Sequence, residues 1–131
     1  MTRKIKFIPG SELMDLDWVY LIILDACRFD YFQKTYQFFF KGNLSKVLSL
    51  GSSTPEWFKN TFRRRYFDTF YISANPFINS ICSVCGCNAR EKFAKVFDAW
   101  WFSWDEILGT VPPNKMNKVV RKILDGARGK R

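Results

Sequence analysis

The apolar run at residues 19–24 (VYLIIL) constrains the fold of this chain more than any other stretch. It contains no charged residue, β-branched and aromatic side chains are prominent in it, and Asp25 follows it directly. Such an uninterrupted run is typical of a strand that is covered on both faces of a parallel sheet. Because the ligands of open α/β sheets gather at the carboxyl ends of the strands, we expect Asp25 to lie at a ligand-binding edge.

Strand and helix patterns alternate along the rest of the chain. Hydrophobic patterning and turn residues predict further strands at residues 2–7, 44–50, 69–73 and 96–100, and helices at residues 28–36, 55–61 and 114–124. In the first helix, Phe29, Phe32 and Tyr36 recur at helical spacing as a core-facing stripe. The alternation predicts an α/β fold with a mostly parallel sheet and helices on both faces, which is a doubly wound, three-layer arrangement.

The aromatic content of the chain is high for its length. With 131 residues and 47% hydrophobic residues, the sequence predicts a single domain over residues 1–131, with a mobile basic tail at 126–131. At 18% aromatic residues, we expect aromatic surface to remain for a partner or for oligomerisation once the core is filled. We favour Trp100, Trp101 and Trp104 as the plug of a sheet edge over a platform for nucleic-acid bases.

The formal charge of +9 favours association with nucleic acid, an anionic membrane or an acidic protein. Arg63, Arg64 and Arg65 form a basic run, which is either a solvated face or a phosphate contact. No apolar run approaches the about 20 residues that a membrane span needs, and the first residues do not form a signal-peptide core. We therefore expect an intracellular protein without a transmembrane segment.

A hydroxyl-rich loop precedes the second predicted helix. Pro55 suits the first helical position, Ser53 or Thr54 suits the cap before it, and Glu56 suits the positive end of the helix dipole. A helix amino terminus also binds anions readily, because its backbone N–H groups are unpaired. The spacing favours a capping role for the two hydroxyls over an anion site.

The chain has no histidine, so it lacks the commonest general base and the commonest metal ligand. Cys82, Cys85 and Cys87 form a C-x-x-C-x-C cluster, and Cys27 follows the predicted central strand. The four thiols are compatible with a tetrahedral zinc site, with disulfides of the kind found in hyperthermophiles, or with free cysteines. Disulfides weigh slightly above zinc, and both weigh above a redox-catalytic role, since no recognisable base flanks a cysteine.

Four segments in order resemble the amino-terminal half of archaeal sulfatase-like proteins of the alkaline phosphatase superfamily. They are LIILDACRFD, GSSTPEWFKNTF, YISANPF and VFDAWWFSWDEILGTVPP, and together they cover most of residues 20–113. The resemblance implies that Asp25 is a ligand of a divalent metal. It also implies that Ser53, with Thr54 as a second candidate, is the nucleophile, and that Asn75 is a further site residue for the anion.

The chain also departs from that family. The family completes its metal sites with aspartates and histidines from a carboxyl-terminal half, whereas this sequence has no histidine. A sulfatase has an arginine two residues after the proline of its C/S-x-P-x-R motif, and here Trp57 stands in its place. The chain thus resembles a cut-down relative, such as a protein that a virus of a hyperthermophilic archaeon makes in the host cytoplasm.

Three functions follow from these features. The leading interpretation is a non-catalytic α/β module that contacts a protein or nucleic-acid partner. The second is a metal-dependent phosphoryl or sulfuryl ester hydrolase with Ser53 as nucleophile, Arg28 or Lys59 as oxyanion contacts, and a second metal carboxylate. Candidates for that carboxylate are Asp30, Asp98 and Asp105. The third is non-specific binding of nucleic acid through the arginine run, the tail and exposed aromatics. The cofactors to consider are a divalent metal and a structural zinc.

Overall fold

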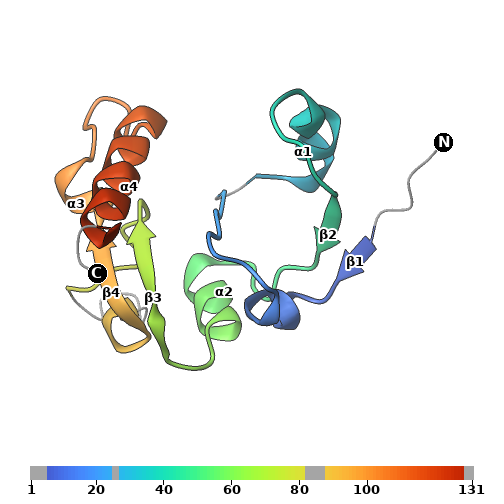
Figure 1. Cartoon of the computed structure of the whole chain (residues 1–131), viewed down its shortest axis with the longest axis horizontal. Coiled ribbons are helices and arrows are strands. Elements are labelled where there is room, and N and C mark those ends of the chain that lie inside the picture. The colour runs from blue at the N-terminus through green and yellow to red at the C-terminus, as the bar shows by residue number, and fades with distance from the viewer. Residues whose placement is uncertain (1–5, 25–26, 82–87, 129–131) are drawn as a thin grey trace. The chain divides into compact units, whose positions relative to one another are not determined.

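The computed structural model describes residues 6–24, 27–81 and 88–128 (Figure 1). The chain divides into two compact units, an amino-terminal unit, Met1–Leu50, and a carboxyl-terminal unit, Gly51–Arg131. The described residues form two sheets of two parallel strands each, together with helices. This confirms the α/β class with parallel strand pairing. The expectation of one domain over residues 1–131 stays a prediction.

In the amino-terminal unit, strand β1 (Lys6–Ile8) pairs in parallel with β2 (Ser45–Val47). The register places Phe7 opposite Lys46. A 3₁₀ helix, η1 (Gly10–Asp15), follows β1. The strand predicted at residues 2–7 is present at Lys6 and Phe7 and runs on to Ile8, while its earlier residues lie outside the described ones. The strand predicted at residues 44–50 is present but shorter.

Helix α1 (Phe29–Thr35) confirms the helix predicted at residues 28–36, and a 3₁₀ turn, η2 (Tyr36–Phe38), continues it. The predicted aromatic stripe is half-buried rather than enclosed. The Phe32 and Tyr36 rings stack with their centroids 5.9 Å apart, and Lys46 Nζ lies 5.2 Å from the centre of the Phe29 ring. The stripe thus packs on itself and on β2.

The central strand predicted at residues 19–24 is wrong. These residues form neither helix nor strand, and the side chains of Val19 and Ile22 are 82% and 79% exposed. The apolar run predicts a strand whose two faces are both covered by other elements. In the structure, β1 and β2 pair directly with each other, without a strand from residues 19–24 between them. In addition, the described residues of this unit include no fully buried hydrophobic side chain. Within the part of this unit that the structure describes, no layer covers residues 19–24 on both faces, as a buried strand would require.

In the carboxyl-terminal unit, β3 (Tyr66–Ser73) pairs in parallel with β4 (Phe93–Asp98). Their connection includes a 3₁₀ turn, η3 (Ala89–Glu91). Both strands begin earlier than the predicted ranges of 69–73 and 96–100. The second range also ends too late, because helix α3 (Ala99–Phe102) takes its last two residues.

Helix α2 (Thr54–Thr61) supplies one side of an aromatic core. Phe62, which follows the helix, is 1% exposed and lies at the centre of this core. Rings from α2, β3 and β4 surround it at centroid distances of 5.0 to 6.1 Å: Trp57, Phe58, Tyr66, Tyr71 and Phe93. Most of these pairs meet edge to face, the geometry that the ring quadrupoles favour.

Helix α4 (Pro113–Arg128) confirms the helix predicted at residues 114–124 and extends it. The first residues of the tail expected at 126–131 are thus helical, and 129–131 lie outside the described residues. The apolar stripe of α4 is only half-buried; its members are Met116, Val119, Val120, Ile123 and Leu124. Across the described residues, no helix combines the length and the apolar character that crossing a membrane requires.

Candidate functional site

The loop before α2 is closed by the chain's own side chains. Ser53 Oγ accepts a hydrogen bond from the Glu56 backbone N–H at 3.5 Å. In return, Glu56 Oε2 accepts from the backbone N–H and from the hydroxyl of Ser52, each at 3.0 Å. This reciprocal pattern is close to a capping box. It confirms the predicted helix cap and shows that Ser53, rather than Thr54, provides it.

Glu56 brings a negative charge to this loop. Its pKa lies below the ordinary value of 4.5, first because the Ser52 backbone N–H donates to the carboxylate and second because the Ser52 hydroxyl does. Gly51 allows the loop backbone to lie close to the first turn of α2, since a Cβ at this position would lie 2.3 Å from the backbone nitrogen of Trp57. Donors that a phosphate or sulfate would seek at this helix terminus therefore already serve an internal carboxylate.

The carboxyl end of β3 is closed by a turn at Asn75. Ser73 Oγ donates to the Asn75 carbonyl oxygen at 2.9 Å and accepts from the Asn75 N–H at 3.2 Å. The Asn75 Oδ1 accepts from the Phe77 N–H at 3.0 Å. These bonds show Asn75 shaping the turn after the strand. Its predicted contact with an anion stays a prediction.

Asp98 ends β4 and ties the two strand ends together. Its carboxylate accepts from the Ser80 N–H at 3.0 Å, from the Ser80 hydroxyl, and from Trp100 Nε1 at 3.1 Å. The register places Asp98 opposite Ser73, so both lie at the same edge of the sheet. Three donors for one part-buried carboxylate fix the segment after β3 to the end of β4.

The other two carboxylates considered for a metal site also have local partners. Asp30 Oδ2 lies 2.9 Å from Arg28 Nη2 in an exposed ion pair, and the Arg28 guanidinium lies 5.2 Å from the centre of the Tyr31 ring. Asp105 Oδ1 accepts from two backbone N–H groups that follow it in a turn. Arg28, predicted as an anion contact, is thus partnered by a carboxylate of its own helix region.

Several predicted site residues lie outside the described residues: Asp25, Cys82, Cys85 and Cys87. Cys27 is exposed in the amino-terminal unit, and Lys59 is exposed on α2. Where side chains are described, no three or more His, Cys, Asp or Glu residues gather as a metal site would need. The predictions of a metal at Asp25, of a structural zinc and of a shared edge for these groups therefore stay predictions.

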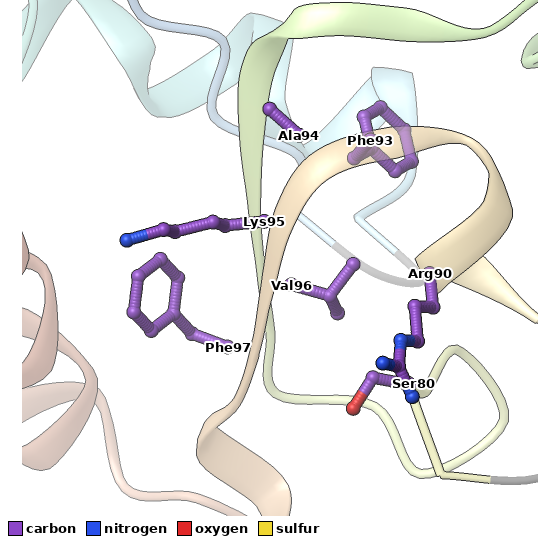
Figure 2. Close-up of a pocket in the computed structure, with 7 residues that line it drawn as sticks. All are labelled: Ser80, Arg90, Phe93, Ala94, Lys95, Val96 and Phe97. Carbon is purple, nitrogen blue, oxygen red and sulfur yellow. The ribbon is translucent and has the colours of Figure 1, made fainter.

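A shallow cavity of about 290 Å³ runs along β4. Figure 2 shows Lys95 and Phe97 extending to one side of the strand and Val96 to the other, with Arg90 beside Ser80. Its polar lining includes the Ser80 hydroxyl, which already donates to Asp98. The sequence pointed to Asp98 but not to its contact with Ser80, because the two lie 18 residues apart and no local spacing connects them.

A second groove, of about 340 Å³, lies between α4 and the end of the sheet. Its lining is mainly apolar and comes from Phe97, Phe102, Val119 and Ile123. Ser103 and three exposed lysines complete it: Lys115, Lys118 and Lys122. We call this the lysine-rimmed groove. The helical pattern predicted α4, but only the structure brings α3 and β4 against its lysine side.

Comparisons of this chain with family models, with curated proteins and with solved structures find no match.

Proposed function

We propose that this protein is a non-catalytic interaction module that contacts an anionic partner through its carboxyl-terminal unit. The lysine-rimmed groove carries the proposal, because it combines three cationic side chains with an apolar lining on one surface. Apolar area supplies affinity when it leaves water, and lysines favour a negatively charged partner. The formal charge of +9 supports the same kind of partner.

The hydrolase alternative is less well supported, because its nucleophile would be Ser53. Ser53 caps α2, and the neighbouring donors serve the Glu56 carboxylate. A nucleophile would need those donors for the oxygens of its substrate, and it would need a base to activate it. The carboxylate of Glu56 would instead repel a phosphate or sulfate ester.

Turnover of aryl phosphates and aryl sulfates with Mg²⁺, Mn²⁺ or Zn²⁺ tests the non-catalytic part of this proposal. We expect no turnover above the buffer rate. We expect Ser53→Ala to lower the free energy of unfolding by about 1 kcal/mol through loss of the cap, without an effect on hydrolysis. Ser11→Ala, which removes an exposed hydroxyl from η1, is the control. Metal-dependent turnover that disappears in Ser53→Ala and persists in Ser11→Ala would establish the hydrolase instead.

We also propose that the chain has a doubly wound, three-layer fold and that it is related to the alkaline phosphatase superfamily, as the resemblance implies. The two parallel pairs support a doubly wound, three-layer sheet, since parallel pairs joined by crossovers are the units of such sheets. The order of the four matching segments supports kinship with the alkaline phosphatase superfamily and action inside a host cell. A crystal structure with anomalous scattering at the zinc edge tests this kinship, and Asp25, Ser53 and Asn75 on different edges would contradict it.

A further inference from the structure

Residues 101–122 place two kinds of exposed side chain on one continuous part of the carboxyl-terminal unit. The first kind is apolar and lies on α3 and on the hairpin that follows it. The second kind is the row of lysines on α4. Buried Ala99 and buried Val111 hold the segment between α3 and α4 at both ends. The segment that carries the exposed apolar side chains is therefore fixed to the core at both ends.

The hairpin at residues 105–110 is braced by its own hydrogen bonds. The Asp105 N–H donates to the Thr110 carbonyl at 2.9 Å, and the Gly109 N–H donates to the Asp105 carbonyl at 2.8 Å. Gly109 has a φ of 65°, in the left-handed region that glycine adopts without strain. Asp105 Oδ1 accepts from the N–H groups of Ile107 and Leu108, each at 2.9 Å.

This bracing holds two aliphatic side chains in water. Ile107 is 96% exposed and Leu108 is 63% exposed at the tip of the hairpin. Trp101 on α3 is 69% exposed, and its neighbour Phe102 is exposed while also lining the lysine-rimmed groove. We call Trp101, Phe102, Ile107 and Leu108 the apolar tip. Four large apolar groups exposed within eight residues indicate a surface that is covered by a partner.

The lysines beside the apolar tip form a row. Lys115, Lys118 and Lys122 are spaced three and four residues apart, so they lie on one side of α4, and all three line the groove that Phe102 also lines. The helix as a whole carries five basic residues and one aspartate. The lysine row thus lies beside Phe102, the member of the apolar tip that lines the same groove.

We propose that this surface docks on an anionic lipid bilayer, with the apolar tip among the upper acyl chains and the lysine row against the lipid phosphates. The inference rests on the proposed function and names its partner. A bilayer presents phosphates and acyl chains on one surface, which matches the pairing of lysines with an aliphatic tip. Tryptophan also favours the boundary between headgroups and acyl chains.

Other anionic partners use this surface less completely. Nucleic acid is bound by cations on its phosphates and by aromatic stacking on its bases, so Ile107 and Leu108 would stay in water. An acidic peptide helix in the lysine-rimmed groove would cover Phe102 but would leave the hairpin tip exposed. Only the lipid surface uses both the hairpin and the lysine row.

Co-sedimentation of the full chain with phosphatidylcholine vesicles, with and without phosphatidylglycerol, tests the proposal. We expect binding to the vesicles that contain phosphatidylglycerol, weakening as salt is added. Each lysine near such a surface contributes roughly fivefold, so the combined Lys115→Gln, Lys118→Gln and Lys122→Gln variant should bind on the order of 100-fold more weakly. The combined Ile107→Ser and Leu108→Ser variant should lose about tenfold or more, with the salt dependence unchanged.

The charge-matched control changes Arg63, Arg64 and Arg65 to glutamine. It removes the same net charge from the same unit, and we expect less than about a fivefold loss, because these arginines lie between α2 and β3. Far-ultraviolet circular dichroism checks that each variant folds. If the triple lysine variant does not fold, Lys118→Gln replaces it, with an expected loss of roughly fivefold.

Three results would overturn the lipid partner: no binding at low salt, equal binding to neutral vesicles, or an equal loss in the arginine control. Tighter binding to single-stranded DNA than to vesicles, lost in the arginine control, would assign the basic surface to nucleic acid instead. If the protein neither binds lipid nor turns over esters, the lipid partner is ruled out but the proposed interaction module is not. Ester turnover that depends on Ser53 removes the proposed function itself.

Discussion

Glu56 makes the cap of α2 sensitive to pH. Hydrogen bonds from Ser52 lower the pKa of its carboxyl, so the folded state favours the ionised form. A group with a lowered folded pKa contributes stability above its unfolded pKa, and this contribution is lost as pH falls through the folded pKa. We therefore expect Glu56→Gln to destabilise the protein at neutral pH and to differ little from the unmodified protein well below pH 4.5.

Urea unfolding of both proteins across this pH range measures the effect. The control is Glu91→Gln in η3, which removes an exposed carboxylate from the same unit without touching the α2 cap. A Glu56→Gln effect that stayed constant from neutral to acid pH would show that the carboxylate charge does not stabilise the cap.

Residue roles were predictable from sequence where the partners lie within one turn of each other. Pro55 and Glu56 predict a helix cap at Ser53 or Thr54, and the hydrogen bonds show that Ser53 is the cap. The Ser80 contact with Asp98 spans 18 residues, so no local pattern could indicate it. Long-range polar pairs of this kind depend on how the strands are registered, which the sequence does not state.

At the scale of elements, α2, β3 and β4 depend on the single ring of Phe62. We expect Phe62→Ala to lower the free energy of unfolding by about 3–5 kcal/mol, because the change leaves a cavity among five neighbouring aromatic rings. Chemical denaturation measures it. The matched control is Phe67→Ala on β3, where the ring is 74% exposed, and we expect a change within about 1 kcal/mol. Equal losses in the two variants would contradict a core centred on Phe62.

Helices were easier to predict than strands in this chain. Periodicity and prolines located α1, α2 and α4 to within a few residues, because helix formation depends on neighbours in sequence. The run at 19–24 has the composition of a buried strand, yet a strand also requires partners and covering layers. The sequence predicts a strand that includes Ala99 and Trp100, whereas the chain turns into α3 directly after Asp98.

At the scale of the whole molecule, hydrophobic burial is uneven. Every fully buried hydrophobic side chain among the described residues belongs to the carboxyl-terminal unit. We therefore expect a fragment of residues 51–131 to unfold cooperatively and to keep the near-ultraviolet circular dichroism of its packed aromatics, because its core is its own. A fragment of residues 1–50 should show neither property.

Thermal unfolding of the two fragments and of the full chain measures this difference. The fragment of residues 51–131 with Phe62→Ala is the control, since it lacks the centre of the core and should lose the near-ultraviolet signal. A fragment of residues 51–131 that unfolds without a cooperative transition would show that this core is not sufficient by itself.

The parallel pairing of the strands also sets the order in which contacts can form. Tyr66 pairs with Phe93 only when the connection that contains η3 closes as a loop. Likewise, Lys6 pairs with Ser45 only when the connection that contains α1 closes. Neither pair can start from a tight turn and close step by step as a hairpin does. Closing these long loops costs conformational entropy before the strands form any stabilising contact. Strand pairing should therefore be a slow step in folding, and α2 and α4 should form faster and earlier.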